Sequence, residues 1–144
     1  MKHRLRPATD KDGDWIYRLK VMTLKAYVAQ TWGWDEAYQR ERFRQRFDPS
    51  SYQIVVVDGQ EVGVIQVEWR ETEVFLGNIQ IAPECQGRGL GSSLIRDVLA
   101  EAESVRLPIV LQVLKVNPAR RLYERLGFVI TEETATHYKM RVKV

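Results

Sequence analysis

The residues best suited to chemistry lie in a glycine-rich stretch, Gln86-Gly87-Arg88-Gly89-Leu90-Gly91-Ser92. An apolar run that ends at Pro83 precedes the stretch, and an amphipathic run follows it directly. Glycines allow a tight turn and a close approach of the backbone to a ligand, and the first N–H groups of a helix lack partners and lie at the positive end of its dipole. The stretch therefore predicts a cradle for an anion such as a pyrophosphate, with Arg88 as a nearby cation. The alternative is a tight turn that binds nothing.

Two familiar phosphate loops do not match these residues. A Walker loop requires Gly-Lys-Ser or Gly-Lys-Thr, and the stretch contains no lysine. A dinucleotide fingerprint requires G-x-G-x-x-G after an early strand of a βαβ unit. Residues 87–91 instead read G-x-G-x-G, and they follow a hairpin late in the chain.

Hydrophobic periodicity and turn signals predict the elements that must position this loop. We expect strands over 2–6, 52–57, 61–69, 73–82, 108–114, 128–133 and 136–143, and helices over 10–29, 35–48, 89–103 and 118–126. The order β-α-α-β-β-β-α-β-α-β-β predicts an α/β fold with a mixed sheet of about seven strands and four helices, in one domain over 1–144. Helical spacing in 10–29 predicts an inward row of Trp15, Leu19, Met22 and Ala26, and the second helix is expected to turn Tyr38, Phe43 and Phe47 inward.

The composition narrows the functional classes. A single cysteine, Cys85, excludes an internal disulfide framework and a multi-cysteine zinc site, and with two histidines among 144 residues we expect no metal. No run approaches the length of a membrane span, and the N-terminus lacks the apolar stretch of a signal peptide, so a cytoplasmic protein without a membrane partner is expected. The net charge of +3 is compatible with an anionic ligand but too small to indicate nucleic acid.

Two blocks resemble the GNAT superfamily of N-acetyltransferases. The family's loop reads Arg/Gln-x-x-Gly-x-Gly/Ala, and Gln86-x-x-Gly89-x-Gly91 matches it in full. The block VLKVNPARRLYERLGF at 113–128 is similar to the family's final helix, and the element order matches across essentially the whole chain. The resemblance implies the GNAT acyl-CoA N-acyltransferase fold of a small bacterial-type member, with a mostly antiparallel sheet. It also implies direct transfer of an acetyl group from acetyl-CoA to a primary amine of a small molecule or peptide, in a ternary complex.

The same resemblance assigns the cofactor contacts. The backbone of residues 86–92 would hold the pyrophosphate, and Ile79, Gln80 and Ile81 would offer main-chain groups to the pantetheine and the thioester. Asn117 resembles the asparagine that holds the pantetheine in many members. Its distance to Ala119 is one residue shorter than usual, so Asn117 could instead cap the last helix.

Tyr123 resembles the family's general acid, which protonates the departing thiolate. The alternative is an aromatic side chain that only packs beside Leu122 and Leu126.

A general base is harder to assign. We expect Phe75, Gly77 and Ile79 on one face of the strand before the loop, and none of them titrates. Ribosomal-protein N-terminal acetyltransferases carry a glutamate where this chain has Gln112. The remaining candidates, in order of preference, are Glu68, Glu73 and His137, and a water chain to solvent is an alternative; Asp35, Glu36 and Glu71 rank behind them.

The segment between the first two helices lines the acceptor side in this family. Here Trp32, Trp34 and Asp35 would form an aromatic and anionic wall for a cationic amine. The alternative is that Asp35 caps the second helix and the tryptophans cover the core. The arginines at 40–46 recur every second residue, which favours a solvated face over a binding site.

The alternative to an acetyltransferase is a non-catalytic acyl-CoA sensor on the same fold. A two-fold homodimer is also expected.

Overall fold

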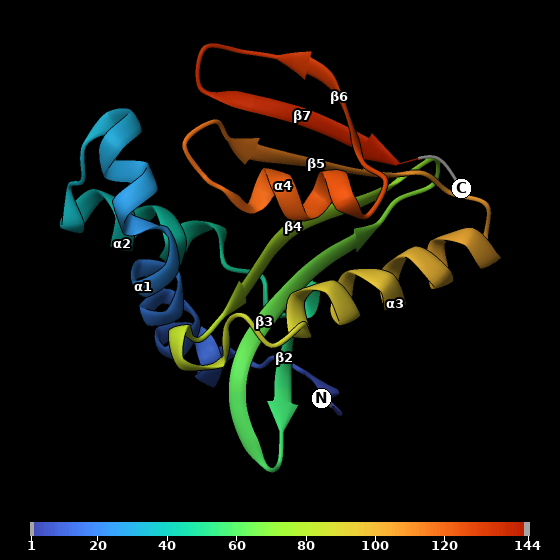
Figure 1. Ribbon diagram of the computed structural model, residues 1–144. Coiled ribbons are helices and arrows are strands. Elements are labelled where there is room, and N and C mark those ends of the chain that lie inside the picture. The colour runs from blue at the N-terminus through green and yellow to red at the C-terminus, as the bar shows by residue number, and fades with distance from the viewer. Residues whose placement is uncertain (1, 143–144) are drawn as a thin grey trace.

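The computed structural model describes residues 2–142 (Figure 1). It contains seven strands and four α-helices in the predicted order: β1 (Arg4–Pro7), α1 (Gly13–Trp32), α2 (Glu36–Arg46), β2 (Tyr52–Val57), β3 (Gln60–Trp69), β4 (Val74–Ile81), α3 (Leu90–Ser104), β5 (Ile109–Leu114), α4 (Ala119–Arg125), β6 (Val129–Glu133) and β7 (His137–Val142). Residue 143 of the predicted last strand and residues 1 and 144 of the predicted domain lie outside the described residues. Within 2–142, no helix is long and apolar enough to cross a membrane.

All seven strands form one sheet in the order β1-β2-β3-β4-β5-β7-β6. Every neighbouring pair is antiparallel except β4 and β5, which run parallel and are paired only at Val74–Ile109 and Phe75–Val110. Beyond these pairs β4 continues to Ile81 and β5 to Leu114. Figure 1 shows the two strands diverging toward α1. The sheet therefore opens between the C-terminal halves of its two central strands.

Helices cover both faces of the sheet. On one face α3 buries Leu90, Leu94 and Ile95 against a cluster that includes Val55 and Ile65. On the other face α1 buries Ile16 and Leu19 against Ile54, Val56 and Val64. The apolar run of β2 is explained by this arrangement, because alternate residues of a strand point to opposite faces and both faces are covered here.

The predicted inward row of α1 is wrong in its second half. Ile16 and Leu19 are buried, whereas Met22 is 60% exposed. The helix begins at Gly13, after a short turn that Thr9 caps, and its buried residues all lie in its first half. Tyr38, expected to point inward from α2, is also exposed.

A β-bulge changes which residues of β4 share a face. The β3–β4 register shifts between Gln66 and Val67, so Gly77 has no partner across the ladder. As a result Phe75, Asn78 and Gln80 lie on one face, and the expected face of Phe75, Gly77 and Ile79 is wrong. A side chain at position 77 would place its Cβ 2.8 Å from Gln66 Oε1, so a larger residue there would displace the Gln66 side chain.

Candidate active site

The opening between β4 and β5 contains a cavity of about 280 Å³, here called the β4–β5 cavity. Its lining residues are Thr23, Leu24, Tyr27, Ile79, Gln80, Ile81, Gln86, Gly91, Asn117, Pro118, Ala119, Leu122 and Tyr123. The cavity brings together residues from β4, from the glycine-rich loop and from α4 that the sequence assigned to one site. The strand splay thus creates the space that those predicted residues surround.

The glycine-rich loop forms a second cavity of about 380 Å³, here called the loop cavity. It shares Ile81, Gln86, Gly91 and Leu122 with the β4–β5 cavity, so the two adjoin. The remaining loop residues that line it are Gly87, Gly89, Leu90 and Ser92, joined by Cys85 and Arg125. Arg88 is exposed and Arg125 lines the cavity instead, a cation that the sequence reasoning missed.

The loop backbone is shaped for an anion. Gly87 and Gly89 have φ values of 76° and 82°, a left-handed conformation that favours glycine. Gly89 precedes α3 and has no side chain to cap it, and the first helical bond runs from Ser93 N to Gly89 O over 3.0 Å. The first N–H groups of α3 are therefore free for a ligand. The Gln86 amide donates a hydrogen bond to the Ile81 carbonyl over 2.9 Å and ties the loop to the end of β4.

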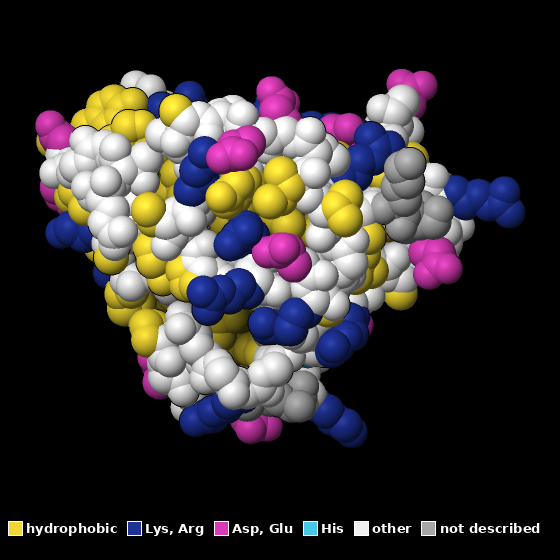
Figure 2. Space-filling model, turned by 45° about the horizontal axis from the view of Figure 1, so that its top comes forward, with side chains coloured by type: hydrophobic (Ala, Val, Ile, Leu, Met, Phe, Trp, Pro, Cys, Tyr) yellow, Lys and Arg dark blue, Asp and Glu magenta, His cyan; other side chains and the backbone are white. Residues whose placement is uncertain are grey.

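Figure 2 shows a hollow on one face of the molecule, with hydrophobic side chains at its floor and Lys or Arg side chains around its rim. An apolar floor and a cationic rim suit a ligand that has both an apolar arm and negative charges.

Tyr123 reaches the β4–β5 cavity from α4 with only 9% of its surface exposed. Its ring packs edge-on against Phe128, with 5.9 Å between ring centroids. Burial raises the pKa of the phenol to about 12, because the phenolate would lose its hydration. The hydroxyl is therefore protonated at neutral pH and can donate a proton or a hydrogen bond.

Asn117 both caps a helix and lines the cavity. Its Oδ1 accepts a hydrogen bond from the Ala119 backbone N–H over 2.9 Å, at the start of α4. The same residue contributes to the wall of the β4–β5 cavity. The cap is therefore observed, and contact with the pantetheine stays a prediction.

A buried amide also lines the β4–β5 cavity. Gln80 is 5% exposed, and within residues 2–142 its Oε1 has no hydrogen-bond partner. Its Nε2 donates to Asn78 Oδ1 over 3.3 Å, Asn78 donates to Gln66, and Gln66 donates to Ser51 Oγ over 3.1 Å. A buried acceptor without a donor is costly, so the Gln80 oxygen is suited to accept an N–H from a ligand in the cavity.

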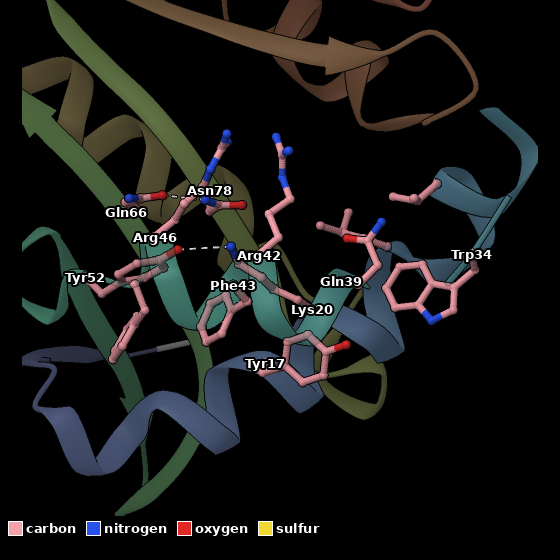
Figure 3. Close-up of a pocket in the computed structure, with 13 residues that line it drawn as sticks. Tyr17, Lys20, Trp34, Gln39, Arg42, Phe43, Arg46, Tyr52, Gln66 and Asn78 are labelled. Carbon is pink, nitrogen blue, oxygen red and sulfur yellow. Dashed lines mark hydrogen bonds between the residues drawn. The ribbon is translucent and has the colours of Figure 1, made fainter. Parts of the chain in front are cut away.

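A third cavity, of about 340 Å³, lies where α1 and α2 meet β3 and β4, and we call it the α1–α2 cavity (Figure 3). It adjoins the β4–β5 cavity, because Leu24 lines both and Asn78 in its wall is bonded to Gln80. Its walls are formed by Tyr17, Lys20, Leu24, Val28, Trp34, Gln39, Arg42, Phe43, Arg46, Phe47, Tyr52, Gln66 and Asn78. The sequence reasoning named only Trp34 among these as a site residue. The spacing of four between Arg42 and Arg46 was the one available signal, because it places both on one helix face.

The three predicted acceptor residues lie in different places. Trp34 lines the α1–α2 cavity, and its Nε1 donates to Glu36 over 2.8 Å. The Asp35 carboxylate accepts from Tyr38 N over 3.0 Å and so caps α2. Trp32 is 62% exposed and packs beside the His137 ring, with 5.7 Å between ring centroids.

The predicted bases are held by other side chains. Glu68 and Glu73 both accept hydrogen bonds from Arg70, over 2.8 and 3.2 Å, and both are partly exposed. Glu68 pairs with Phe75 in the β3–β4 ladder and so shares the sheet face of Gln66 and Asn78. His137 contacts the Thr136 hydroxyl over 2.8 Å, and burial lowers its pKa.

Two curated relatives match part of the chain. The mycothiol acetyltransferase of Streptomyces coelicolor is 34% identical over 99 residues, and the match covers 65% of this chain and 31% of that protein. The 5-NmdU N-acetyltransferase of Pseudomonas phage PaMx11 is 39% identical over 71 residues, which are 49% of each chain. The chain thus spans less than half the length of these relatives.

Solved structures share the fold over the whole chain. The PaiA N-acetyltransferase of Thermoplasma acidophilum, solved in complex with coenzyme A, has a TM-score of 0.80 at 15% identity and covers 100% of both chains. An acetyltransferase of Thermus thermophilus has a TM-score of 0.77 at 18% identity, over 100% of this chain and 98% of that one. The predicted fold is therefore confirmed.

The family comparison reaches the elements that build the site. The acetyltransferase (GNAT) domain matches residues 20–142, a range that includes β4, the glycine-rich loop, α3 and α4. On this match, the chain belongs to the GNAT acetyltransferase family.

Proposed function

We propose that this protein is an N-acetyltransferase that passes the acetyl group of acetyl-CoA directly to a primary amine of a small molecule or peptide. The observation that carries the proposal is the position of Tyr123, which lies in the wall of a cavity that adjoins the glycine-rich loop. The coenzyme A complex of the structurally similar PaiA protein supports the choice of cosubstrate.

The cofactor would lie along two sets of backbone groups. The free N–H groups at the start of α3 would bind the pyrophosphate, with Arg125 nearby. Because β4 pairs with β5 only as far as Phe75, the backbone of Ile79, Gln80 and Ile81 has no strand partner on that side. These groups would bind the pantetheine amides as a further strand would.

In the transfer step, the neutral amine attacks the thioester carbonyl carbon and a C–N bond forms. The nitrogen of the tetrahedral intermediate then loses one proton to water, and the C–S bond breaks as the thiolate takes the proton of the Tyr123 hydroxyl. Solvent later returns a proton to the Tyr123 oxygen. The free Oε1 of Gln80 would accept an N–H of the attacking amine and hold its lone pair toward the carbonyl carbon.

The amine must lose a proton before it attacks. We retain Glu68 as the proposed base, because it shares a sheet face with Gln66 and Asn78 in the wall of the α1–α2 cavity. Glu73 is the alternative, since the same Arg70 binds it. In the other alternative, a chain of water molecules carries the proton to solvent and neither glutamate acts as the base.

The names of the two curated relatives are compatible with an amine acceptor. One is named for mycothiol and the other for 5-NmdU, and both are named acetyltransferases. We therefore place the acceptor in the α1–α2 cavity, whose volume of about 340 Å³ suits a small molecule or the end of a peptide. A homodimer and a cytoplasmic location stay predictions from the sequence.

The test is a coupled binding and turnover experiment. Coenzyme A binding is measured by calorimetry, and release of free thiol from acetyl-CoA is followed with a panel of small amines and peptides. We expect binding and amine-dependent thiol release. Binding without turnover on any amine would favour the acyl-CoA sensor, and absence of coenzyme A binding would refute the proposal.

A further inference from the structure

Three cations line the α1–α2 cavity. Lys20 comes from α1, and Arg42 and Arg46 come from adjacent turns of α2. Figure 3 shows the two arginine side chains extending from α2 in the same direction. Within residues 2–142, none of the three forms an ion pair with a carboxylate.

The other arginines of α2 differ in this respect. Arg40 pairs with Glu36 over 3.5 Å, and Arg44 pairs with Glu41 over 3.2 Å. The alternation therefore separates two charge-paired arginines from two that face the cavity without a counter-ion. Arg42 and Arg46 are both exposed, and Arg42 donates to the Tyr38 hydroxyl over 3.1 Å, so both guanidinium groups are accessible to a ligand in the cavity.

Lys20 is the most deeply buried of the three cations. Its ammonium group donates to the Tyr52 hydroxyl over 3.0 Å and lies 5.1 Å from the centroid of the Phe43 ring. Burial lowers its pKa to about 8, because these neutral partners replace water poorly. The carboxylate that acts electrostatically on Tyr52 is Glu68, and it is already held by Arg70.

The remaining walls suit an organic anion. The amides of Gln39, Gln66 and Asn78 offer hydrogen bonds, and the rings of Trp34 and Phe43 offer an apolar surface. Guanidinium groups bind carboxylate and phosphate oxygens in pairs of charge-assisted hydrogen bonds. An anion at this position would supply the counter-charge that the protein does not.

We propose that the α1–α2 cavity binds an anionic group of the acceptor, so that the substrate is an amine that also carries a carboxylate or a phosphate. The inference rests on the proposed function, because it assigns this cavity to the acceptor. Arg42 and Arg46 would bind the anion with Lys20, and the amine would extend past Asn78 toward Gln80 and Tyr123. The sequence predicted an aromatic and anionic wall that binds the amine of the acceptor. The proposed cavity instead binds the anionic group at the other end of the acceptor.

The test compares matched amines. Two probe series are used: ω-amino acids of increasing chain length with their carboxamides, and aminoalkyl phosphates with the corresponding amino alcohols. The measured quantity is kcat/KM for thiol release from acetyl-CoA. We expect the anionic member of at least one series to exceed its neutral partner by about 10- to 100-fold, as for a hydrogen-bonded charge. The series that shows the preference identifies a carboxylate or a phosphate.

Variants locate the effect. Arg42→Gln and Arg46→Gln should each lower the ratio of kcat/KM for the anionic amine to kcat/KM for its neutral partner about tenfold. Arg44→Gln is the matched control, because it removes the same charge from the same helix outside the cavity, and it should leave the preference unchanged. Equal kcat/KM for anionic and neutral amines, or an equal loss in Arg44→Gln, would overturn the proposal.

Direct binding separates this inference from the proposed function. Calorimetry is repeated with the probes, in the presence of coenzyme A. Binding of anionic probes that is lost in Arg42→Gln, without turnover of any amine, would support the anion site and refute the transferase. Turnover of neutral and anionic amines at equal rates would support the transferase and refute the anion site. If no probe binds and no probe is turned over, the anion site is refuted.

Discussion

Phe75 and Val110 form the last residue pair between the parallel strands β4 and β5, and beyond them the strands separate. The proposed contacts of the pantetheine and the thioester depend on this separation. It leaves the backbone of 79–81 without a strand partner, and it opens the cavity that Tyr123 and Asn117 line. The glycines of the loop that follows β4 line the adjoining loop cavity.

Removing the Tyr123 hydroxyl should slow transfer without affecting coenzyme A binding. Tyr123→Phe keeps the edge-on packing against Phe128 and removes the proton donor. We expect kcat to fall by about 10²-fold, the lower end of the effect of a positioned acid, with an unchanged Kd for coenzyme A. Tyr27→Phe is the control, because Tyr27 lines the same cavity and has no assigned proton transfer. Full turnover by a folded Tyr123→Phe variant would remove Tyr123 as the acid.

Asn117 can be divided into its two roles by substitution. Asn117→Asp keeps an oxygen that accepts from Ala119 N, so the helix cap should survive, but it loses the amide N–H₂ and adds a negative charge. We expect unchanged thermal stability and weaker coenzyme A binding. Asn117→Ala should weaken binding and also cost about 1 kcal/mol of stability. Wild-type coenzyme A affinity in Asn117→Asp would leave Asn117 as a cap alone.

Burial of Lys20 should cost stability in a manner that depends on pH. Its pKa is lowered from 10.5 to about 8 in the folded protein. Below about 8 both folded and unfolded chains are protonated at Lys20 and the full cost is present. Between about 8 and 10.5 only the unfolded chain keeps the proton, so folded stability rises as the pH rises through this window.

Lys20→Met should therefore stabilise the protein at neutral pH by roughly 1–3 kcal/mol, the upper value being set by the size of the pKa shift. The gain should shrink across the same window and vanish above it. Urea unfolding at several pH values measures this. Lys25→Met, at an exposed position of the same helix, should show no such trend. A gain for Lys20→Met that is constant with pH would contradict the explanation.

The proposed base can be tested with a matched pair. Glu68→Gln and Glu73→Gln each remove one partner of Arg70 at a partly exposed site, so each should change stability by less than about 1 kcal/mol. We expect Glu68→Gln to lower kcat about tenfold or more and Glu73→Gln to change it little. Initial rates across pH provide the readout. Equal, wild-type rates in both variants would assign deprotonation of the amine to water.

Local residue types predicted where the glycine-rich loop and Tyr123 lie, and both line adjoining cavities. Gly89 adopts a left-handed conformation at the start of α3, which glycine tolerates, so the shape of the loop is predictable from its residues. The position of Tyr123 was also predictable, because the resemblance covers the whole of α4.

The acceptor side was not predictable in this way. Lys20 lies on a helix whose inward face was misjudged, since α1 covers the sheet only with its first half. The inward direction of Asn78 and Gln80 depends on the bulge at Gly77, which no residue type announces. The cationic cavity needs α1, α2 and β4 together, so its charge appears only when the fold is complete.

The fate of the acetyl group tests the central claim most directly. Isotopically labelled acetyl-CoA is incubated with the protein and an amine acceptor, and mass spectrometry follows both the small molecules and the intact chain. Direct transfer predicts label on the acceptor nitrogen in amounts equal to the free coenzyme A, and none on the protein, including Cys85 in the loop cavity. Label that accumulates on the chain and never reaches an amine would contradict the account.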